Sequence, residues 1–209
     1  VLWRDAARTE PALVWHGLRQ QNTKAPGRPN RCLSDFVGPQ GVSDHVGVFA
    51  VTAGLGVDAK EQYFLKDHDD YSAIMLKALA DRLAEAFAEC MHARVRRDLW
   101  GYAAGEQLSH EELIKEKYQG IRPAPGYPAC PDHSVKRGMF EVLQCADIGM
   151  TLTDSLAMTP AASVSGFYIG HPDACYFNVG RIGDDQVQDL AHRQGVAEKE
   201  LLRLLAPNL

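Results

Sequence analysis

The residues best suited to chemistry lie in one proline-rich loop, with the sequence GIRPAPGYPACPDH at positions 120–133. Proline fixes the backbone angle φ and lacks an amide hydrogen, so four prolines make this loop rigid before any ligand arrives. Arg122 offers a planar guanidinium that suits a carboxylate or a phosphate, and Tyr127 offers a flat amphipathic ring. The amides of Ala124, Gly126 and Tyr127 would also be in place to meet a ligand. The loop is therefore either a preorganised binding segment or a stiff connector between two helices.

Other kinds of reactive site are less well supported. Cys130 and His133 have the spacing of metal ligands, and three further residues could join them: Cys145, His171 and Cys175. No second C-x-x-C or H-x-x-H pair accompanies them, which disfavours a zinc protein and leaves metal analysis to settle the question. A catalytic pair of Cys130 with His133 is also disfavoured, because a nucleophile and its base usually come from separate elements. The chain has no glycine-rich Rossmann or P-loop motif.

The composition narrows the class of protein further. The 209 residues are 45% hydrophobic, which is enough for one substantial core and leaves room for a second lobe. The net charge is −5 and no dense Lys/Arg run occurs, which disfavours nucleic acid as a partner. No apolar run reaches the length of a membrane span, and the first residues lack the pattern of a signal peptide. Five widely spaced cysteines indicate reduced thiols and a cytoplasmic protein, and the missing initiator methionine indicates a piece of a longer polypeptide.

Helices and strands in irregular order must position the loop. Apolar periodicity predicts helices at 10–22, 70–102, 109–118 and 135–144, and two more in the tail 184–209. Strands are predicted at 45–54, 151–158, 162–170 and 174–182, with the last two joined as a hairpin. An extended segment at 31–39 holds Asp35 between apolar neighbours, where a buried carboxylate would need a partner. We predict a single α+β domain with a mixed or antiparallel sheet.

The long helix at 70–102 has two apolar sides. We predict that a core-facing stripe is formed by residues that recur at helical spacing, namely Leu79, Leu83, Ala86, Phe87 and Cys90. Three alanines, Ala80, Ala84 and Ala88, form a flank that other backbone could approach closely. Glu85 falls on the remaining polar side, where such side chains are usually solvated.

Several segments together resemble one known family. They are CLSDFV, FAVTAGLG, HDDYSAIMLKALADRLAEAFAE, YQGIRPAPGYP, SVSGFYIGHPD and the closing LLAPNL. In this order they are similar to the activation domain of cobalamin-dependent methionine synthase, the C-terminal module that binds S-adenosylmethionine. The chain departs from the family in three places. Residues 1–209 resemble the domain without its N-terminal part, Ser134-Val135 stands where Thr-Glu is usual, and Tyr176-Phe177 stands where two tyrosines are common.

The resemblance implies a fold and a function. The family's fold is a single C-shaped α+β domain, with a bent, mainly antiparallel sheet flanked by helices that include one long helix. The parent enzyme is a methyltransferase that passes a methyl group from methyltetrahydrofolate to homocysteine through cobalamin. When its cobalamin is oxidised to cob(II)alamin, the activation domain supports reductive methylation. A flavodoxin or a flavoprotein reductase supplies the electron, and cobalamin stays on a neighbouring domain. The isolated domain would bind its ligand without turnover.

The resemblance also implies a set of binding residues. Arg122 would pair with the carboxylate of S-adenosylmethionine, and Asp35 would hold its amino group. The remaining residues of the site would be Ala124, Gly126, Tyr176, Phe177, Glu85 and Glu116. The backbone of Ala124 and Gly126 would line the site, the two aromatic rings would lie beside the adenosine, and the two glutamates would favour the sulfonium cation. Tyr127 would face the corrin, and no residue is assigned to catalysis or to a metal.

Ordinary structural roles remain open for several of these residues. Glu116 could pair with a neighbouring lysine, and Tyr176 with Phe177 could be strand aromatics on opposite faces. A second function is also open, in which the chain is a docking module of the same fold that no longer binds S-adenosylmethionine. Ligand affinity separates these two functions.

Overall fold

The computed structural model describes residues 1–209, which form two compact units. Unit 1 comprises Val1–Gly47, Gly120–Gly138 and Phe167–Leu209. Unit 2 comprises Val48–Gln119 and Met139–Gly166. The proline-rich loop belongs to unit 1, and the long helix belongs to unit 2.

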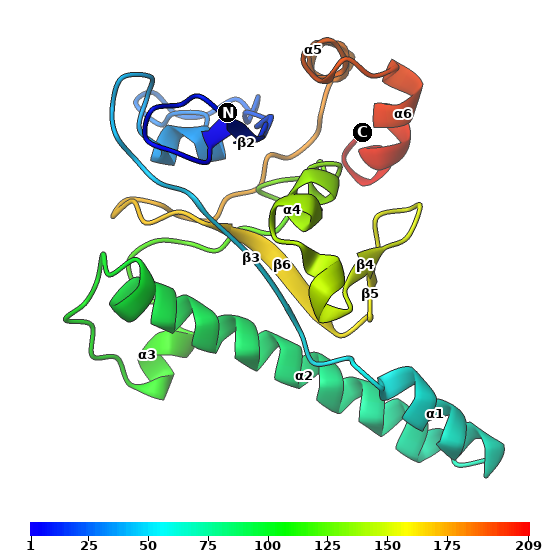
Figure 1. Ribbon diagram of the computed structural model, residues 1–209. Helices are drawn as coiled ribbons and strands as arrows, with labels where there is room; N and C mark the ends of the chain where they lie inside the picture. Colours follow the sequence, from blue (N-terminus) through cyan, green and yellow to red (C-terminus); the bar gives the residue numbers. More distant parts are fainter. The chain divides into compact units, whose positions relative to one another are not determined.

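The elements are labelled in Figure 1, and their bounds follow in chain order. They are β1 (Leu2–Trp3), β2 (Pro11–Leu13), the 3-10 turn η1 (Leu33–Phe36), β3 (Gly47–Thr52), α1 (Val57–Lys66), α2 (Asp70–Arg94), the π-helical turn η2 (Val95–Leu99), α3 (His110–Ile114), α4 (Lys136–Val142), η3 (Cys145–Ile148), β4 (Thr151–Leu152), β5 (Met158–Thr159), β6 (Ser163–Tyr168), α5 (Asp184–Gln194), α6 (Glu198–Leu204) and η4 (Ala206–Asn208). None of the helices is both long enough and apolar enough to span a membrane.

The strands pair as three two-stranded sheets, β1–β2, β3–β6 and β4–β5. The first and third pairs are antiparallel. In the β3–β6 pair, the amide of Ala53 donates to the carbonyl of Ala162, while Gly47 at the other end of β3 lies against Tyr168. This register makes the β3–β6 pair antiparallel as well. The predicted α+β class, with one long helix, is therefore confirmed.

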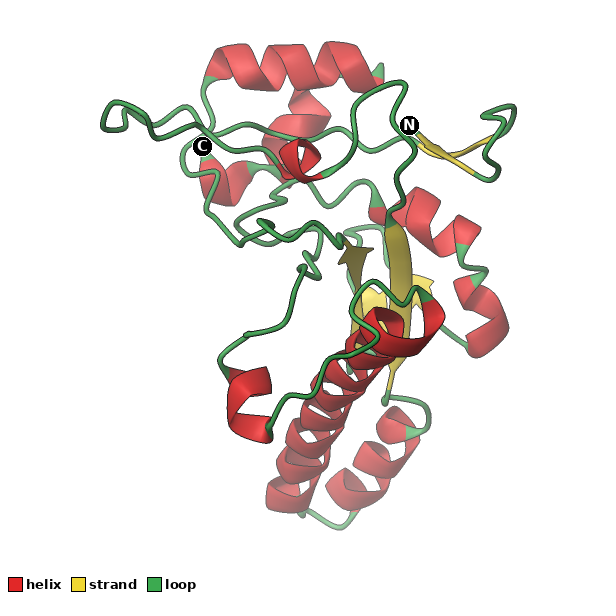
Figure 2. Ribbon diagram, turned by 90° about the vertical axis from the view of Figure 1, so that its left-hand side faces the viewer, coloured by secondary structure: helices red, strands yellow, loops and turns green.

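The long helix forms as predicted, but its buried side is the alanine flank. Ala80, Ala84 and Ala88 are almost completely buried, and the first two pack with the residues that flank the β3–β6 pair. Leu79, Leu83 and Phe87 are exposed, so the prediction that they face the core of this chain was wrong. Small side chains let the helix lie close to the neighbouring backbone, which larger leucines would keep at a distance. Figures 1 and 2 show α2 running alongside the strand pair.

Substitutions on the two sides of α2 should therefore have unequal effects. We expect Ala84→Leu to lower the free energy of unfolding by about 1–3 kcal/mol, because added methylenes overpack a closed contact. Leu83→Ala should change it by less than about 0.5 kcal/mol, because Leu83 is exposed. Urea denaturation of the 209-residue chain measures both values. The reverse order would mean that the leucine side is the packed one.

The C-terminal end of the long helix carries a buried charge that the sequence pattern did not indicate. Arg96 lies in η2, a π-helical turn that extends α2, and its side chain is fully buried. Its guanidinium donates to Glu106 at 2.7 to 3.0 Å and lies 4.1 Å from the ring centroid of Tyr118. Nearby, Tyr102 approaches His92, and burial raises the pKa of Tyr102 to about 12. This cluster fixes the chain that follows the long helix.

The four helices predicted after the long helix form with shorter bounds, and one helix before it was missed. α3 begins after the predicted capping box of Ser109 and Glu112, in which each residue bonds to the other. α5 and α6 are separated by Gly195 in the left-handed conformation, as the tail pattern indicated. The sequence reading assigned no helix to Val57–Lys66, where α1 lies.

Two predicted elements of unit 1 are wrong. Residues 10–22 contain the short strand β2 and irregular chain in place of a helix, and residues 174–182 form no strand and therefore no hairpin with β6. Tertiary contacts explain both. Trp15 stacks on Phe167 with ring centroids 4.1 Å apart, and Leu18 is buried in a cluster with α5 and α6. The segment 31–39 is likewise a 3-10 turn at Leu33–Phe36 and not fully extended.

Candidate functional site

Backbone hydrogen bonds hold the proline-rich loop at two points. Ile121, the second residue of the loop, exchanges two bonds with Ile169, at 2.9 and 3.0 Å. Further along, the carbonyl of Pro128 accepts a 2.9 Å bond from the amide of Val179. Prolines limit the conformations between these two anchors. The loop is therefore preorganised, as its composition predicts.

The tip of the loop is a tight turn that uses its own amides. Gly126, at φ +93°, donates to the carbonyl of Cys130 at 2.8 Å, and the amide of Cys130 donates to the carbonyl of Tyr127 at 2.8 Å. The amide of Tyr127 donates to the carbonyl of Ala124 at 3.3 Å. The expectation that the amides of Gly126 and Tyr127 await a ligand was therefore wrong. Closing the turn requires these donors, so the loop offers a ligand its side chains and other backbone groups.

Two of the predicted site residues are joined directly. The backbone amide of Arg122 donates a 3.0 Å hydrogen bond to the hydroxyl of Tyr176. Arg122 is half-buried, and the Tyr176 ring is exposed. Phe177 points elsewhere, because it packs against both hydrophobic clusters of unit 1. The aromatic pair therefore splits, with one ring beside the loop and the other in the core behind it.

Asp35 lies next to the loop but already has strong partners. Its neighbours Leu33 and Phe36 pack in one cluster with Ile121, the residue before Arg122. The Asp35 carboxylate accepts two 2.6 Å bonds from the guanidinium of Arg19 and a 2.9 Å bond from the amide of Cys32. The bonds from Arg19, and to a lesser extent the one from Cys32, hold the pKa of Asp35 below its ordinary value.

Arg19 is the residue that the sequence pattern did not connect with Asp35. Arg19 also donates to the carbonyl of Asn30 at 2.8 Å, so it ties the chain before the 3-10 turn to the turn itself. A ligand ammonium could contact Asp35 only by sharing this carboxylate with Arg19 or displacing it. Asp35 is exposed in the structure, and the protein itself supplies the partner of its carboxylate.

The remaining predicted residues occupy two different settings. Tyr127, at the tip of the loop, is 62% exposed, so its ring is available to a large partner. Glu85 and Glu116 belong to unit 2, where both are exposed. Glu85 lies on the polar side of α2. Glu116 follows α3 in the left-handed conformation, and its amide donates to the carbonyl of Leu113.

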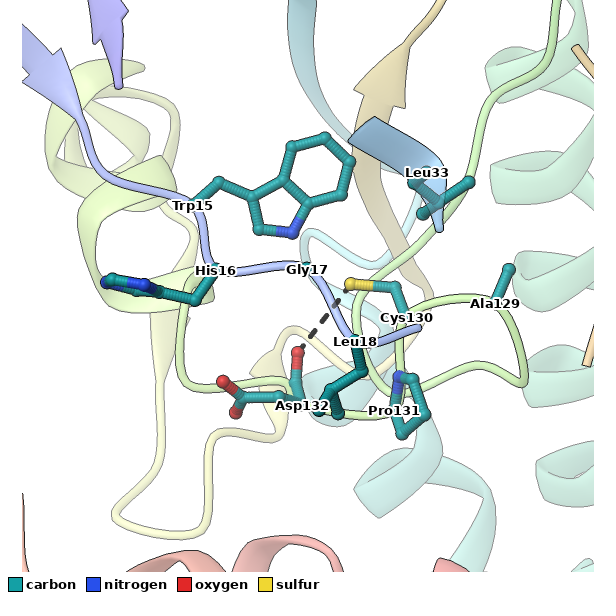
Figure 3. Close-up of a pocket in the computed structure, with 9 residues that line it drawn as sticks. All are labelled: Trp15, His16, Gly17, Leu18, Leu33, Ala129, Cys130, Pro131 and Asp132. Carbon is teal, nitrogen blue, oxygen red and sulfur yellow. Dashed lines mark hydrogen bonds between the residues drawn. The ribbon is translucent and has the colours of Figure 1, made fainter. Parts of the chain in front are cut away.

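A small cavity of about 10 Å³ lies behind the loop in unit 1. Figure 3 shows Trp15 and Cys130 on its walls, with the indole nitrogen directed toward the cysteine sulfur. The Cys130 thiol donates to the carbonyl of Asp132 at 3.7 Å. Sites for drug-sized ligands usually enclose about 300 Å³ or more. The cavity is therefore too small for a nucleoside.

Comparisons with known proteins identify the family. Residues 1–195 match the family model described as vitamin B12 dependent methionine synthase, activation domain. The chain belongs to this activation-domain family. A solved structure described as the MetH reactivation domain bound to AdoHcy is 56% identical and superposes with a TM-score of 0.96. The match covers all of this chain and 65% of the other, so this chain spans about two thirds of that relative's length.

Membership of the activation-domain family gives no support to the alternative metal or cysteine chemistry, and neither does the local geometry. Cys130 is buried, and the structure gathers no group of three or more side chains arranged to hold a metal ion. Asp132 is bonded to Ser134 and Gln194, and so serves as a structural acceptor before α4. Burial lowers the pKa of His133, which favours its neutral form.

The cysteines of this activation domain should differ sharply in reactivity. We expect iodoacetamide at pH 8 to alkylate exposed Cys90 and to leave Cys130 unmodified, because only a thiolate reacts. Burial raises the pKa of Cys130 to about 12, and its sulfur is out of reach of reagent. Peptide mass spectrometry measures both sites, and alkylation in urea is the control that should modify all five cysteines. Equal rates at the two sites in the folded chain would contradict the buried placement of Cys130.

Proposed function

We propose that the chain binds S-adenosylmethionine and S-adenosylhomocysteine on the outer side of the proline-rich loop. The observation that carries the proposal is the half-buried residue Arg122 on a rigid loop, whose backbone amide donates to the hydroxyl of Tyr176. Family membership and the AdoHcy-bound relative support the choice of ligand.

Each proposed contact follows from the chemistry of the ligand. The Arg122 fork pairs with the carboxylate of the amino-acid end, which suits a bidentate bond. The Tyr176 ring lies beside the adenosine, with Phe177 supporting it from the core, and the backbone of Ala124 and Gly126 lines the site. Asp35 meets the ligand ammonium by sharing its carboxylate with Arg19. Contacts of Glu85 and Glu116 with the sulfonium remain part of the proposal, because negative charge favours that cation.

The biological role that we propose is reactivation of cobalamin-dependent methionine synthase, a cytoplasmic methyltransferase. S-adenosylmethionine supplies the methyl group for reductive methylation of cob(II)alamin, and cobalamin stays on a neighbouring domain. A flavodoxin or a flavoprotein reductase supplies the electron. The contribution of this chain is to bind and orient the methyl donor and to present exposed Tyr127 toward the corrin.

Calorimetric titration of S-adenosylhomocysteine into the 209-residue chain tests the proposal directly. We expect saturable binding with one ligand per chain, and we expect S-adenosylmethionine to compete for the same site. The chain alone should transfer no methyl group, because the acceptor lies elsewhere. Absence of binding by a chain with cooperative unfolding would favour the docking module, and methyl transfer without cobalamin would contradict the proposed role.

A further inference from the structure

The exposed side of α2 carries a continuous row of large apolar side chains. Met75, Leu79, Leu83 and Phe87 follow one another at four-residue spacing, and each is at least 41% exposed. Cys90 continues the same row and is also exposed. The row extends about 18 Å along the helix from Met75 to Phe87. We refer to these five residues as the apolar ridge.

The ridge lies beside the buried alanine side of α2, about 100° around the helix from it. The packed side of α2 consists of Ala80, Ala84 and Ala88. The helix is therefore held in unit 2 without burying the ridge. Single exposed leucines are ordinary, whereas a contiguous apolar row is typical of a surface that another element covers. Side chains at four-residue spacing form a ridge on a helix, and such a ridge packs into the grooves between the side chains of a second helix.

We infer that an amphipathic helix covers the apolar ridge. This helix belongs to the part of the reactivation domain, about a third of the solved relative, that has no counterpart in this chain. The relative's chain is described as a reactivation domain, and about a third of its length has no counterpart here. All of this chain superposes on that relative at a TM-score of 0.96. The unmatched third therefore packs against a fold that the 209 residues already have. Parts of one domain bury apolar surface against each other.

Charge beside the ridge argues against a membrane as its occupant. The exposed polar side of α2 carries Asp81, Arg82 and Glu85, so acidic residues outnumber basic ones there. Helices that lie on membrane surfaces usually have a polar side rich in lysine and arginine. The net charge of −5 also opposes attraction to anionic lipid. The ridge thus suits an apolar protein helix.

The decisive experiment supplies the unmatched third of the solved relative as a separate polypeptide. Cys90 is a native probe of the ridge, because it is exposed there while three of the other cysteines are buried. We expect the added polypeptide to bind saturably and to slow alkylation of Cys90 by about tenfold or more. Leu79→Gln with Leu83→Gln should weaken binding about 100-fold, because two buried leucines would be lost. Asp81→Asn, on the polar side of the same helix, should change binding by less than about twofold.

A fused chain is the control for the case in which the separate polypeptide does not fold by itself. In it, the unmatched third is joined to the 209 residues as in the relative, and Cys90 should again be protected from alkylation. Full reactivity of Cys90 in the fused chain would overturn the inference, as would binding that the double variant leaves intact. A concentration-dependent dimer of the 209-residue chain that Leu79→Gln with Leu83→Gln abolishes would assign the ridge to a second copy and also overturn it.

Discussion

Arg96→Ala is expected to lower the free energy of unfolding by about 3–5 kcal/mol, because it leaves one partner of a buried ion pair without the other. The Arg96 side chain is fully buried, and three of its hydrogen-bond contacts reach Glu106 at 2.7 to 3.0 Å. Alanine would leave the Glu106 carboxylate in a site from which water is largely excluded. The packing of the guanidinium on Tyr118 would be lost as well.

Two further variants separate this effect from a general loss of charge. Arg97→Ala removes the same charge from the neighbouring exposed position and should change stability by less than about 0.5 kcal/mol. Arg96→Met combined with Glu106→Leu removes both charges of the closest pair and should recover part of the loss. Only Glu89, which is 28% exposed and lies 3.9 Å from the Arg96 guanidinium, then loses an ion-pair partner. Urea denaturation followed by circular dichroism measures all three. A cost of Arg96→Ala no greater than that of Arg97→Ala would contradict the buried pair.

Arg96 illustrates where sequence reasoning about this fold stops. Within the run ARVRR at 93–97, nothing distinguishes Arg96 from its exposed neighbours Arg94 and Arg97. Its burial depends on Glu106 and Tyr118, which arrive from the chain beyond the helix. A charged residue becomes recognisable as buried only when its partner is known, and that partner is set by tertiary structure.

Elements with strong local signals were predicted well. The capping box at Ser109 and Glu112 starts α3, and the β-branched apolar run around Val51 forms β3. Such signals depend on residues within one or two turns of each other. The segment 10–22 lacks this advantage, because its conformation is decided by the stacking of Trp15 on Phe167 and by the burial of Leu18.

The rotation of α2 was ambiguous for a different reason. Both the alanine side and the leucine side are apolar, and hydrophobicity alone favours burying the larger side chains. The structure buries Ala84 and Ala88 and exposes Leu83. Close backbone approach decides the packing within this unit, and the larger residues are left for another element. A single sequence cannot rank these two contributions.

The candidate site divides in the same way. The rigidity of the loop could be predicted because its prolines lie close together in sequence, whereas the role of Arg122 stays a prediction. The pairing of Arg19 with Asp35 could not, because the two residues come from segments joined only in the folded chain. The bond between Arg122 and Tyr176 spans a still longer separation. Local chemistry identifies the loop, and tertiary contacts complete its surroundings.

Arg122→Ala is expected to weaken binding of S-adenosylhomocysteine by about 30-fold or more, because a charge-assisted bond to the ligand carboxylate would be lost. Arg122→Lys keeps the charge but not the planar fork, so it should cost about tenfold. Arg28→Ala, at an exposed position of the same unit, is the control and should leave affinity unchanged. Calorimetric titration of each variant gives the dissociation constants.

A truncated ligand shows whether Arg122 acts on the carboxylate or on the loop. 5′-Methylthioadenosine keeps the adenosine and the sulfur but lacks the amino-acid end. If Arg122 pairs with the carboxylate, Arg122→Ala should weaken S-adenosylhomocysteine and leave 5′-methylthioadenosine within about twofold, because the truncated ligand never made the bond. If binding of both ligands weakens equally, the Arg122 side chain maintains the conformation of the loop. The loop also positions Tyr176, because the backbone amide of Arg122 donates to the Tyr176 hydroxyl. Asp35→Asn can be read in the same way for the ammonium, since its effect should likewise vanish with the truncated ligand if Asp35 contacts that group.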